Sequence, residues 1–156
     1  MIVRAATEDD LPALRRLMQS VQDLHADAHP EVFRPTLDSE GAADFFAGLL
    51  ANDHHLLLVA ESAGNTIGYV WCEERQSTDS FHRLGAHTGY IHHVAVMPDH
   101  RRAGVGRQLI AEAIAKLKKR GATRVGVDFW SFNDRARAFF TGLGFAVERE
   151  VASRNL

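Results

Sequence analysis

Hydrophobic residues recur every three or four positions in four stretches of the chain, which is the spacing of one buried helical face. The stretches predicted as helices are residues 11–24, 39–50, 105–117 and 133–143. Thr7, followed by three acidic residues, predicts a cap for the first helix, and Asp38 or Ser39 predicts a cap for the second. The pattern thus predicts four helices, each with one buried face.

Runs rich in β-branched and aromatic residues lie between these helices and predict strands. The runs are residues 2–5, 55–62, 66–74, 89–96, 123–130 and 144–151. Ala63, Gly64 and Asn65 join the second and third runs as a hairpin, because Gly and Asn tolerate positive φ. The polar residues 75–87 predict a long loop before the fourth run. The order of elements indicates one mixed α/β domain.

The composition fits a single globular domain and excludes several classes of function. The chain has 156 residues, of which 46% are hydrophobic and 24% charged, so residues 1–156 are expected to form one domain with a sizeable core. A net charge of −2 argues against nucleic acid or an anionic membrane as a partner. Cys72 is the single cysteine, the first residues lack a signal-peptide pattern, and no apolar run reaches the ~20 residues of a membrane span. We expect a soluble cytoplasmic protein.

The stretch HRRAGVG lies between a predicted strand and a predicted helix. Backbone N–H groups at a helix start have no partner inside the helix and, together with the helix dipole, attract an anion such as phosphate. Gly104 and Gly106 allow close approach of a ligand, and Arg101, Arg102 and Arg107 add positive charge. A tight turn with solvated arginines is the alternative interpretation of an isolated GxG pattern.

Other familiar chemistry is not indicated. The chain has no Gly-Lys pair for a P-loop, and Leu109 stands where the dinucleotide-binding pattern GxGxxG has its last glycine. The pairs His54-His55 and His92-His93 would point apart on strands, and HExxH and CxxC motifs are missing, so we expect no metal site. A serine hydrolase is not indicated, because the chain has no G-x-S-x-G elbow.

Two blocks of the sequence together resemble the signature of the GCN5-related N-acetyltransferase (GNAT) superfamily. YIHHVAVMPDHRRAGVGRQLI is similar to the family's strand, its [R/Q]-x-x-G-x-[G/A] turn and its following helix. NDRARAFFTGLGF is similar to the family's N-x-x-A-x-x-[hydrophobic]-Y-x-x-x-G-F block. The resemblance implies an α/β (α+β) fold with a mixed, mostly antiparallel central sheet of six to seven strands, flanked by about four helices. A splayed central strand pair would form the acetyl-CoA slot.

The resemblance also implies that the chain binds acetyl-CoA, as a co-substrate, mainly through its backbone. The amides of the turn would hold the pyrophosphate, and the strand before the turn would pair with the pantetheine arm. A β-bulge near Val94 and Ala95 would open the slot, and the Val94 amide, or one beside it, would polarise the thioester carbonyl. The residues implied for acetyl-CoA are Val94, Ala95, Val96, Arg101, Arg102, Ala103, Gly104, Val105, Gly106, Arg107, Asn133 and Phe140.

An attacking amine has to be neutral, so the site needs a proton acceptor. Strand alternation allows only one of His92 and His93 to face the slot. His92 is favoured as the base, because several relatives that acetylate small amines carry an acid or a histidine at its position. Tyr90 would share the face of His92, and Glu73 and Glu74, at the end of the neighbouring strand, are alternatives as base or relay.

Phe140 is a departure from the family pattern. Many relatives have a tyrosine there that protonates the leaving thiolate, and a phenyl ring has no proton to give. Tyr90, Ser131 and Cys72 are alternatives as acid, and a thiolate with a pKa of roughly 8.5 leaves readily without one. The main prediction is an N-acetyltransferase acting on a primary amine, and the alternative is a non-catalytic acetyl-CoA-binding sensor or scaffold.

The sequence does not name the acceptor, but a small-molecule amine is favoured over a peptide N-terminus or lysine. The loop after the first helix, with His29, Glu31 and Phe33 as candidates, and the loop of residues 75–87 should contact it, and Trp71 on the third strand is another candidate. Solvated surface and cleft wall are the alternative interpretations of these residues. A single strand after Phe145 would leave a short sheet edge, which favours a homodimer.

Overall fold

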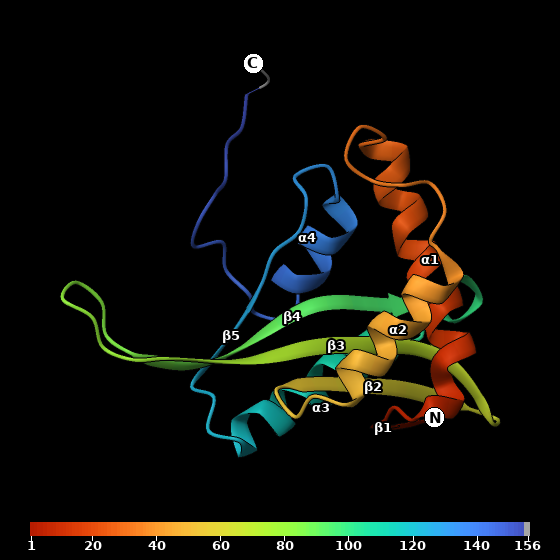
Figure 1. Cartoon of the computed structure of the whole chain (residues 1–156), viewed down its shortest axis with the longest axis horizontal. Coiled ribbons are helices and arrows are strands. Elements are labelled where there is room, and N and C mark those ends of the chain that lie inside the picture. The colour runs from red at the N-terminus through yellow and green to blue at the C-terminus, as the bar shows by residue number, and fades with distance from the viewer. Residues whose placement is uncertain (155–156) are drawn as a thin grey trace.

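Five strands form a mixed sheet at the centre of the computed structural model, which describes residues 1–154 (Figure 1). The strands are β1 (Ile2–Ala5), β2 (His55–Ser62), β3 (Asn65–Ser77), β4 (Ala86–Val96) and β5 (Arg124–Val127). They lie in chain order across the sheet, with antiparallel pairing from β1 to β4 and parallel pairing between β4 and β5. The prediction of six to seven strands was therefore wrong.

Four helices flank this sheet, as the hydrophobic periodicity predicts. They are α1 (Leu11–Ala28), α2 (Ser39–Leu50), α3 (Val105–Lys119) and α4 (Asp134–Thr141). Short 3-10 helices, η1 (Glu8–Asp10) and η2 (Pro98–His100), precede α1 and follow β4. α1 and α2 cover one face of the sheet and α3 covers the other (Figure 1). None of the described helices is long and apolar enough to cross a membrane.

The central strand β3 separates two cores, because its side chains alternate between the two faces of the sheet. Tyr69 packs with residues of α1 and α2, whereas Val70 and Cys72 pack with residues of α3, and all three are buried. Trp71 is partly buried and lies at the margin of the core beneath α1 and α2. The face of the sheet around Trp71 is where the candidate catalytic residues lie.

Backbone geometry confirms two local predictions. The β2–β3 turn has Ala63 at φ 49° and Gly64 at φ 76°, as a tight hairpin with two residues in the left-handed region requires. The Asp38 carboxylate accepts a hydrogen bond from Gly41 N at 2.8 Å and so caps α2.

The hairpin of β3 and β4 is longer than predicted. β3 continues to Ser77 and β4 begins at Ala86, so the loop predicted over residues 75–87 is reduced to residues 78–85. The two strands form an arm that projects from the rest of the molecule (Figure 1). Most of the arm's side chains are exposed, so its sequence lacks the hydrophobic alternation that indicates a strand.

The strand predicted over residues 144–151 does not form in the described part of the chain. Gly144 has φ 88°, and Phe145 N donates to Phe140 O at 3.1 Å, which ends α4 with a left-handed turn. The Phe145 ring then packs on Phe140. β5 stops at Val127, so the neighbouring strand offers only a four-residue edge for a further ladder.

A buried carboxylate joins the first strand to the first helix. Asp10 is 3% exposed and accepts hydrogen bonds from Arg4 at 2.7 and 3.0 Å and from Thr66 Oγ1 at 2.6 Å. Burial alone would raise the pKa of Asp10, but the hydrogen bonds outweigh burial and lower that pKa to about 2. Asp10 therefore stays ionised inside the folded protein over almost the whole pH range.

Asp10 gives a prediction for stability against pH. Because its pKa is lower in the folded than in the unfolded protein, its contribution is present above about pH 5 and is lost as the pH falls toward 2. We expect Asp10→Asn to lower the free energy of unfolding by about 2 kcal/mol near neutral pH and by much less near pH 2. Urea unfolding of both proteins at the two pH values measures this, and an equal difference at both would contradict it.

Candidate functional site

A β-bulge on β4 places both adjacent histidines on one face of the sheet. Trp71 is opposite His93 and Cys72 is opposite Ile91, so His92 is the extra residue of the bulge. The Trp71 ring stacks on His92 at a centroid distance of 4.0 Å and meets His93 edge-on at 5.6 Å. The bulge was predicted near Val94 and Ala95, and the histidines were predicted on opposite faces; the extra residue at His92 overturns both predictions.

β4 continues beyond its partner β5 and so has an open side. The β4–β5 pairing ends at Ile91 and Val127, whereas β4 runs on to Val96. Met97 N donates to β3 at 2.9 Å. Because the backbone groups of successive strand residues point to alternate sides, the N–H groups of Val94 and Val96 point away from β3, to the open side. An extended ligand can pair with this side as though it were another strand.

The start of α3 follows a turn that two left-handed residues shape. Arg102 has φ 63°, and Gly104, the N-cap residue, has φ 82°. Because α3 begins directly after Gly104, the N–H groups of residues 105–107 have no acceptor within the helix. A Cβ on Gly104 would meet no atom within 4 Å, so its backbone conformation is what requires glycine. A Cβ on Gly106 would lie 3.2 Å from the Phe139 ring, so Gly106 allows α4 to approach α3 closely.

The start of α4 and its buried face are fixed by their own contacts. The Asn133 side chain accepts a hydrogen bond from Ala136 N at 3.0 Å and caps α4. Phe140 is 4% exposed and packs against three other phenylalanine rings at centroid distances of 5.1 to 6.0 Å. Phe140 is therefore part of the apolar core on the α3 face.

His92 is held by a carboxylate on the neighbouring strand. His92 Nε2 lies 2.8 Å from Glu73 Oε2, and Arg75 Nε donates to the same oxygen at 2.8 Å. Burial would raise the pKa of Glu73, but the hydrogen bonds from His92 and Arg75 outweigh burial and lower that pKa. An ionised carboxylate only accepts hydrogen bonds, so Nε2 of His92 is the donor. In the neutral ring this leaves Nδ1 with the lone pair that a general base needs.

His93 has a different environment from that of His92. Its Nδ1 lies 3.1 Å from the Tyr69 hydroxyl, which is buried beneath α1 and α2. Burial, and then the nearby His25 and His92, lower the pKa of His93 to about 4. His93 is therefore a neutral, hydrogen-bonded residue at the edge of the core, and His92 is the better placed of the two to exchange a proton with a ligand.

Tyr90 extends the site toward the end of β5. Its hydroxyl donates to Asp128 Oδ1 at 2.5 Å, and the Arg75 guanidinium lies 3.9 Å from the centre of its ring. Burial, and then the hydrogen bond to Asp128, raise the pKa of Tyr90 to about 12, so Tyr90 is a poor acid for a thiolate. Sequence reasoning missed the contacts of Arg75 and Asp128, because the first was assigned to the loop of residues 75–87 and the second to the strand predicted over residues 123–130.

Two other residues considered for proton transfer lie on the opposite face of the sheet. Glu74 pairs with His87 Nε2 at 2.7 Å and with Arg120 at 3.4 Å, which ties β3 and β4 to the end of α3. Cys72 is buried in the α3 core, and burial raises the pKa of its thiol to about 12. Neither residue contacts His92, so neither fits the role of base, relay or acid.

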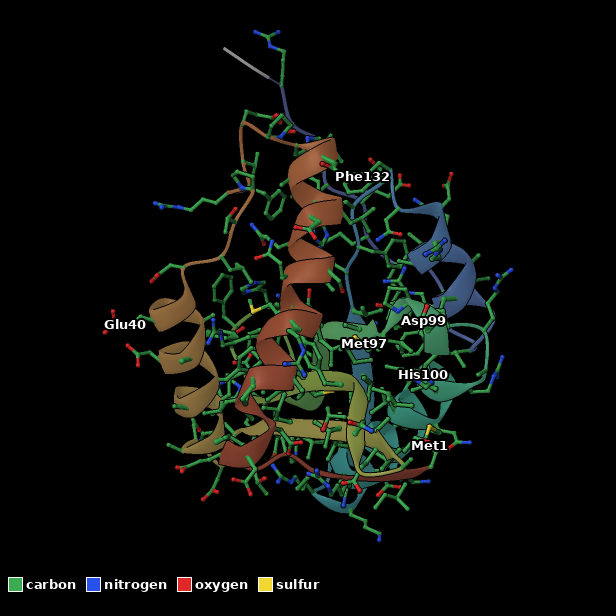
Figure 2. The ribbon with its side chains drawn as sticks, turned by 90° about the vertical axis from the view of Figure 1, so that its right-hand side faces the viewer. Met1, Glu40, Met97, Asp99, His100 and Phe132 are labelled. Carbon is green, nitrogen blue, oxygen red and sulfur yellow. The ribbon has the colours of Figure 1, made fainter. Side chains whose placement is uncertain are left out.

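The predicted acceptor residues after α1 lie in an aromatic cluster. His29 and Phe33 pack against Trp130, with ring centroids 4.7 and 5.4 Å apart. Phe132 joins them beside the end of α1 (Figure 2). Glu31 is exposed and its Oε1 lies 3.0 Å from His29 Nδ1. The cluster joins the end of α1 to the segment after β5. The fourth predicted acceptor residue, Trp71, lies apart from the cluster and packs against the two histidines of β4.

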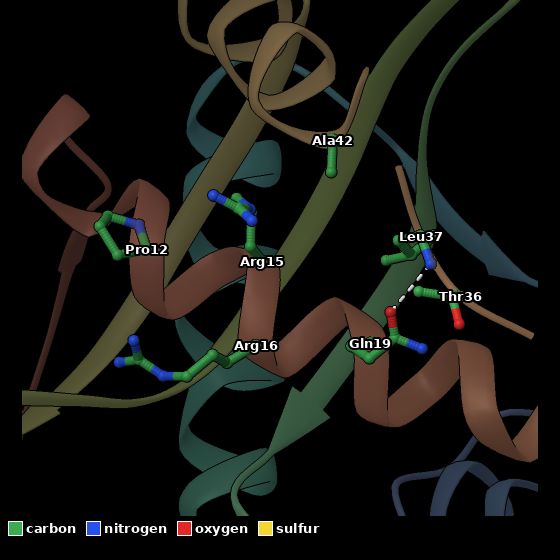
Figure 3. Close-up of a pocket in the computed structure, with 7 residues that line it drawn as sticks. All are labelled: Pro12, Arg15, Arg16, Gln19, Thr36, Leu37 and Ala42. Atoms are coloured by element: carbon green, nitrogen blue, oxygen red, sulfur yellow. Dashed lines mark hydrogen bonds between the residues drawn. The ribbon is translucent and has the colours of Figure 1, made fainter. Parts of the chain in front are cut away.

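One surface pocket lies on the α1 and α2 side of the molecule, and a second lies beside the base of the arm. One of about 360 Å³ separates α1 from α2 (Figure 3) and is lined by Pro12, Arg15, Arg16, Gln19, Thr36, Leu37 and Ala42. Gln19 Oε1 accepts from Leu37 N at 3.0 Å, which fixes the segment before α2 against α1. The second, of about 390 Å³, includes His55, Glu73 and Arg75 and therefore adjoins the carboxylate that holds His92.

An open β4 edge beside an amide-lined helix start defines a domain that can hold an extended ligand ending in phosphate. The sequence profile of the Acetyltransferase (GNAT) family matches residues 18–145, which is most of the chain. The chain belongs to the GNAT family.

Individual proteins agree with this assignment. The uncharacterized N-acetyltransferase MJ1207 of Methanocaldococcus jannaschii is 35% identical over 107 residues, or 69% of this chain, which spans 46% of that relative's length. A variant of the BH1408 protein of Bacillus halodurans matches with a TM-score of 0.93 and 26% identity, covering 100% of this chain and 99% of its own. The aminoglycoside N-acetyltransferase AAC(6')-Iy in complex with CoA matches with a TM-score of 0.80 and 20% identity, covering 99% and 93%. The last of these shares the fold.

Proposed function

We propose that this protein transfers an acetyl group from acetyl-CoA to a primary amine by direct attack in a ternary complex. The observation that carries the proposal is His92, which lies at the bulge of β4 beside its open edge and is oriented by Glu73. Membership of the GNAT family supports the class of reaction, and the CoA complex of AAC(6')-Iy supports the donor.

In this proposal acetyl-CoA is the co-substrate and binds along the open side of β4. The N–H groups at the start of α3 receive the pyrophosphate, and Arg102 and Arg107 add charge near it. Arg101 Nε donates to Val96 O at 3.0 Å and so braces the turn against the strand. The pantetheine arm pairs with the backbone of Val94 and Val96. The Val94 N–H is the donor for the oxyanion that forms at the thioester carbonyl.

The chemical step removes two protons from the ammonium form of the acceptor and expels one leaving group. The acceptor binds as an ammonium ion, gives its first proton to Nδ1 of His92, and attacks the thioester carbon with the freed lone pair. The C–N bond forms, and the C–S bond breaks with its electron pair passing to sulfur. The second proton then passes from the new amide nitrogen to the departed thiolate, which becomes the free thiol. Glu73 accepts the hydrogen bond from Nε2 of His92 and so holds the ring in place during the transfer. Phe140 supplies no proton, and a thiolate with an ordinary pKa of roughly 8.5 leaves without one.

We propose a small-molecule amine as the acceptor rather than a peptide N-terminus or a lysine side chain. The aromatic cluster of His29, Phe33, Trp130 and Phe132 joins the end of α1 to the segment after β5. A cluster that joins these segments leaves less room for an extended peptide than two separate loops would. Trp71 offers an aromatic surface next to His92 on the same face.

The alternative function is acetyl-CoA binding without catalysis, which Phe140 favours because it removes the family's usual acid. Release of free thiol from acetyl-CoA, measured with a broad panel of amines, separates the two. We expect amine-dependent thiol release by the native protein and a large loss of it in His92→Ala. If no amine supports turnover while acetyl-CoA raises the melting temperature, the protein is a binder and the enzymatic proposal fails.

A further inference from the structure

We infer that Asp128 binds the ammonium group of the acceptor, an inference that rests on the proposed function. Asp128 follows Val127, which is the last residue of β5 and pairs with Ile91 at the end of the β4–β5 ladder. Asp128 therefore lies where the two strands part. In the proposed complex this is the end of the slot next to the thioester, because the next residue of β4 is His92.

Tyr90 holds the Asp128 carboxylate in place. The Tyr90 hydroxyl donates to Oδ1 of Asp128 at 2.5 Å, and Tyr90 is a neutral donor. Within the described residues, Oδ2 of Asp128 receives no hydrogen bond, and the residue is exposed. One oxygen is thus fixed by the protein and the other is free to accept a hydrogen bond from a cation.

The same tyrosine links Asp128 to the proposed base. The Tyr90 ring meets the His92 ring edge-on at a centroid distance of 5.0 Å, so Tyr90 contacts both His92 and, through its hydroxyl, Asp128. Arg75 covers the Tyr90 ring, but Glu73 binds its guanidinium at 2.7 Å and offsets its charge. An amine whose ammonium group is bound by Asp128 is therefore close to the residue that takes its proton.

This arrangement is compatible with the loss of a proton from the acceptor. A strong, buried ion pair would hold the ammonium in its charged form and oppose attack. Asp128 is exposed, and exposed ion pairs are weak, so binding concentrates the acceptor without preventing deprotonation. The contact acts mainly on binding, and its removal should raise KM rather than lower kcat.

The test compares Asp128→Asn with the native enzyme on acceptors of different charge. We expect KM for a protonated alkylamine to rise by about tenfold, with kcat and KM for acetyl-CoA changed by less than about twofold. For an aromatic amine, which is neutral at the assay pH, we expect no change in KM. Tyr90→Phe should show a smaller effect of the same kind. Asp44→Asn, which removes an exposed charge from α2, is the matched control and should change none of these constants.

Two outcomes would overturn the inference: an unchanged KM for alkylamines in Asp128→Asn, or equal losses for charged and neutral amines. If Asp128→Asn does not fold, as judged by its melting temperature, KM for charged and neutral amines is compared between Tyr90→Phe and the native enzyme instead. An unchanged KM for alkylamines in Tyr90→Phe would then overturn the inference. A failure here is distinct from failure of the proposed function, because native enzyme that acetylates no amine refutes the latter, whereas normal activity in Asp128→Asn refutes only the role of Asp128.

Discussion

Replacing His92 with glutamine is expected to lower kcat for amine acetylation by about 10²- to 10³-fold. Glutamine retains an N–H that can donate to Glu73, but its amide has no basic nitrogen to accept the proton of the ammonium. The proposed acetyl-CoA site is built from backbone groups that follow the bulge along the chain. The affinity for acetyl-CoA should therefore change by less than about twofold. Initial rates of thiol release and calorimetric titration with acetyl-CoA measure the two quantities.

Two matched variants separate this effect from general damage. His82→Gln makes the same change on the exposed tip of the arm and should leave kcat unchanged. Glu73→Gln keeps the base but loses the carboxylate that orients it, and should cost about tenfold in kcat. A His92→Gln enzyme that retains more than about half of the native kcat would refute the role of His92 as base.

Gly104→Val is expected to weaken acetyl-CoA binding by about tenfold or more. Gly104 has φ 82°, and a β-branched residue in this region is strongly strained, so the turn has to change its path before α3 begins. The N–H groups of residues 105–107 would then no longer converge on one phosphate. A strain of about 1.4 kcal/mol already corresponds to a factor of ten in affinity. Titration calorimetry with acetyl-CoA measures the loss.

The chain supplies two controls for this prediction. Gly64 also has positive φ, at 76°, with no atom within 4 Å of an added Cβ, so Gly64→Val introduces similar strain in a hairpin far along the chain. That variant should lose stability but keep its affinity for acetyl-CoA. Gly48→Val, on the exposed surface of α2, should affect neither strongly. Equal affinity for acetyl-CoA in Gly104→Val and native protein would exclude the turn as a phosphate site.

The helices and the order of elements could be predicted because their hydrophobic periods are local. The caps at Asp38 and the turn at Gly64 were predictable for the same reason, since each depends on a few adjacent residues. The last strand was not predictable, because whether residues 144–151 form a ladder depends on the length of β5 and on the anchoring of Phe145 to α4. Tertiary contacts, rather than the β-type sequence pattern, therefore determine the conformation of this segment.

The candidate site was predicted in part. The resemblance to the GNAT family identified the turn before α3 and favoured His92 over His93. Alternation then placed those two histidines on opposite faces, because a single extra residue in a strand leaves no mark in the hydrophobic pattern. The Arg75 and Asp128 contacts required the actual register of β3 with β4 and of β4 with β5, which the sequence does not contain.

The most direct test of the proposed acetyl transfer is its stoichiometry. Acetyl-CoA and a responsive amine are incubated with the native protein, and free thiol and acetylated amine are counted together, the latter by mass spectrometry. We expect one acetylated amine for each thiol released, and neither product without protein. Thiol release without an acetylated amine, or no release with any amine of a broad panel, would contradict the assignment of this protein as an N-acetyltransferase.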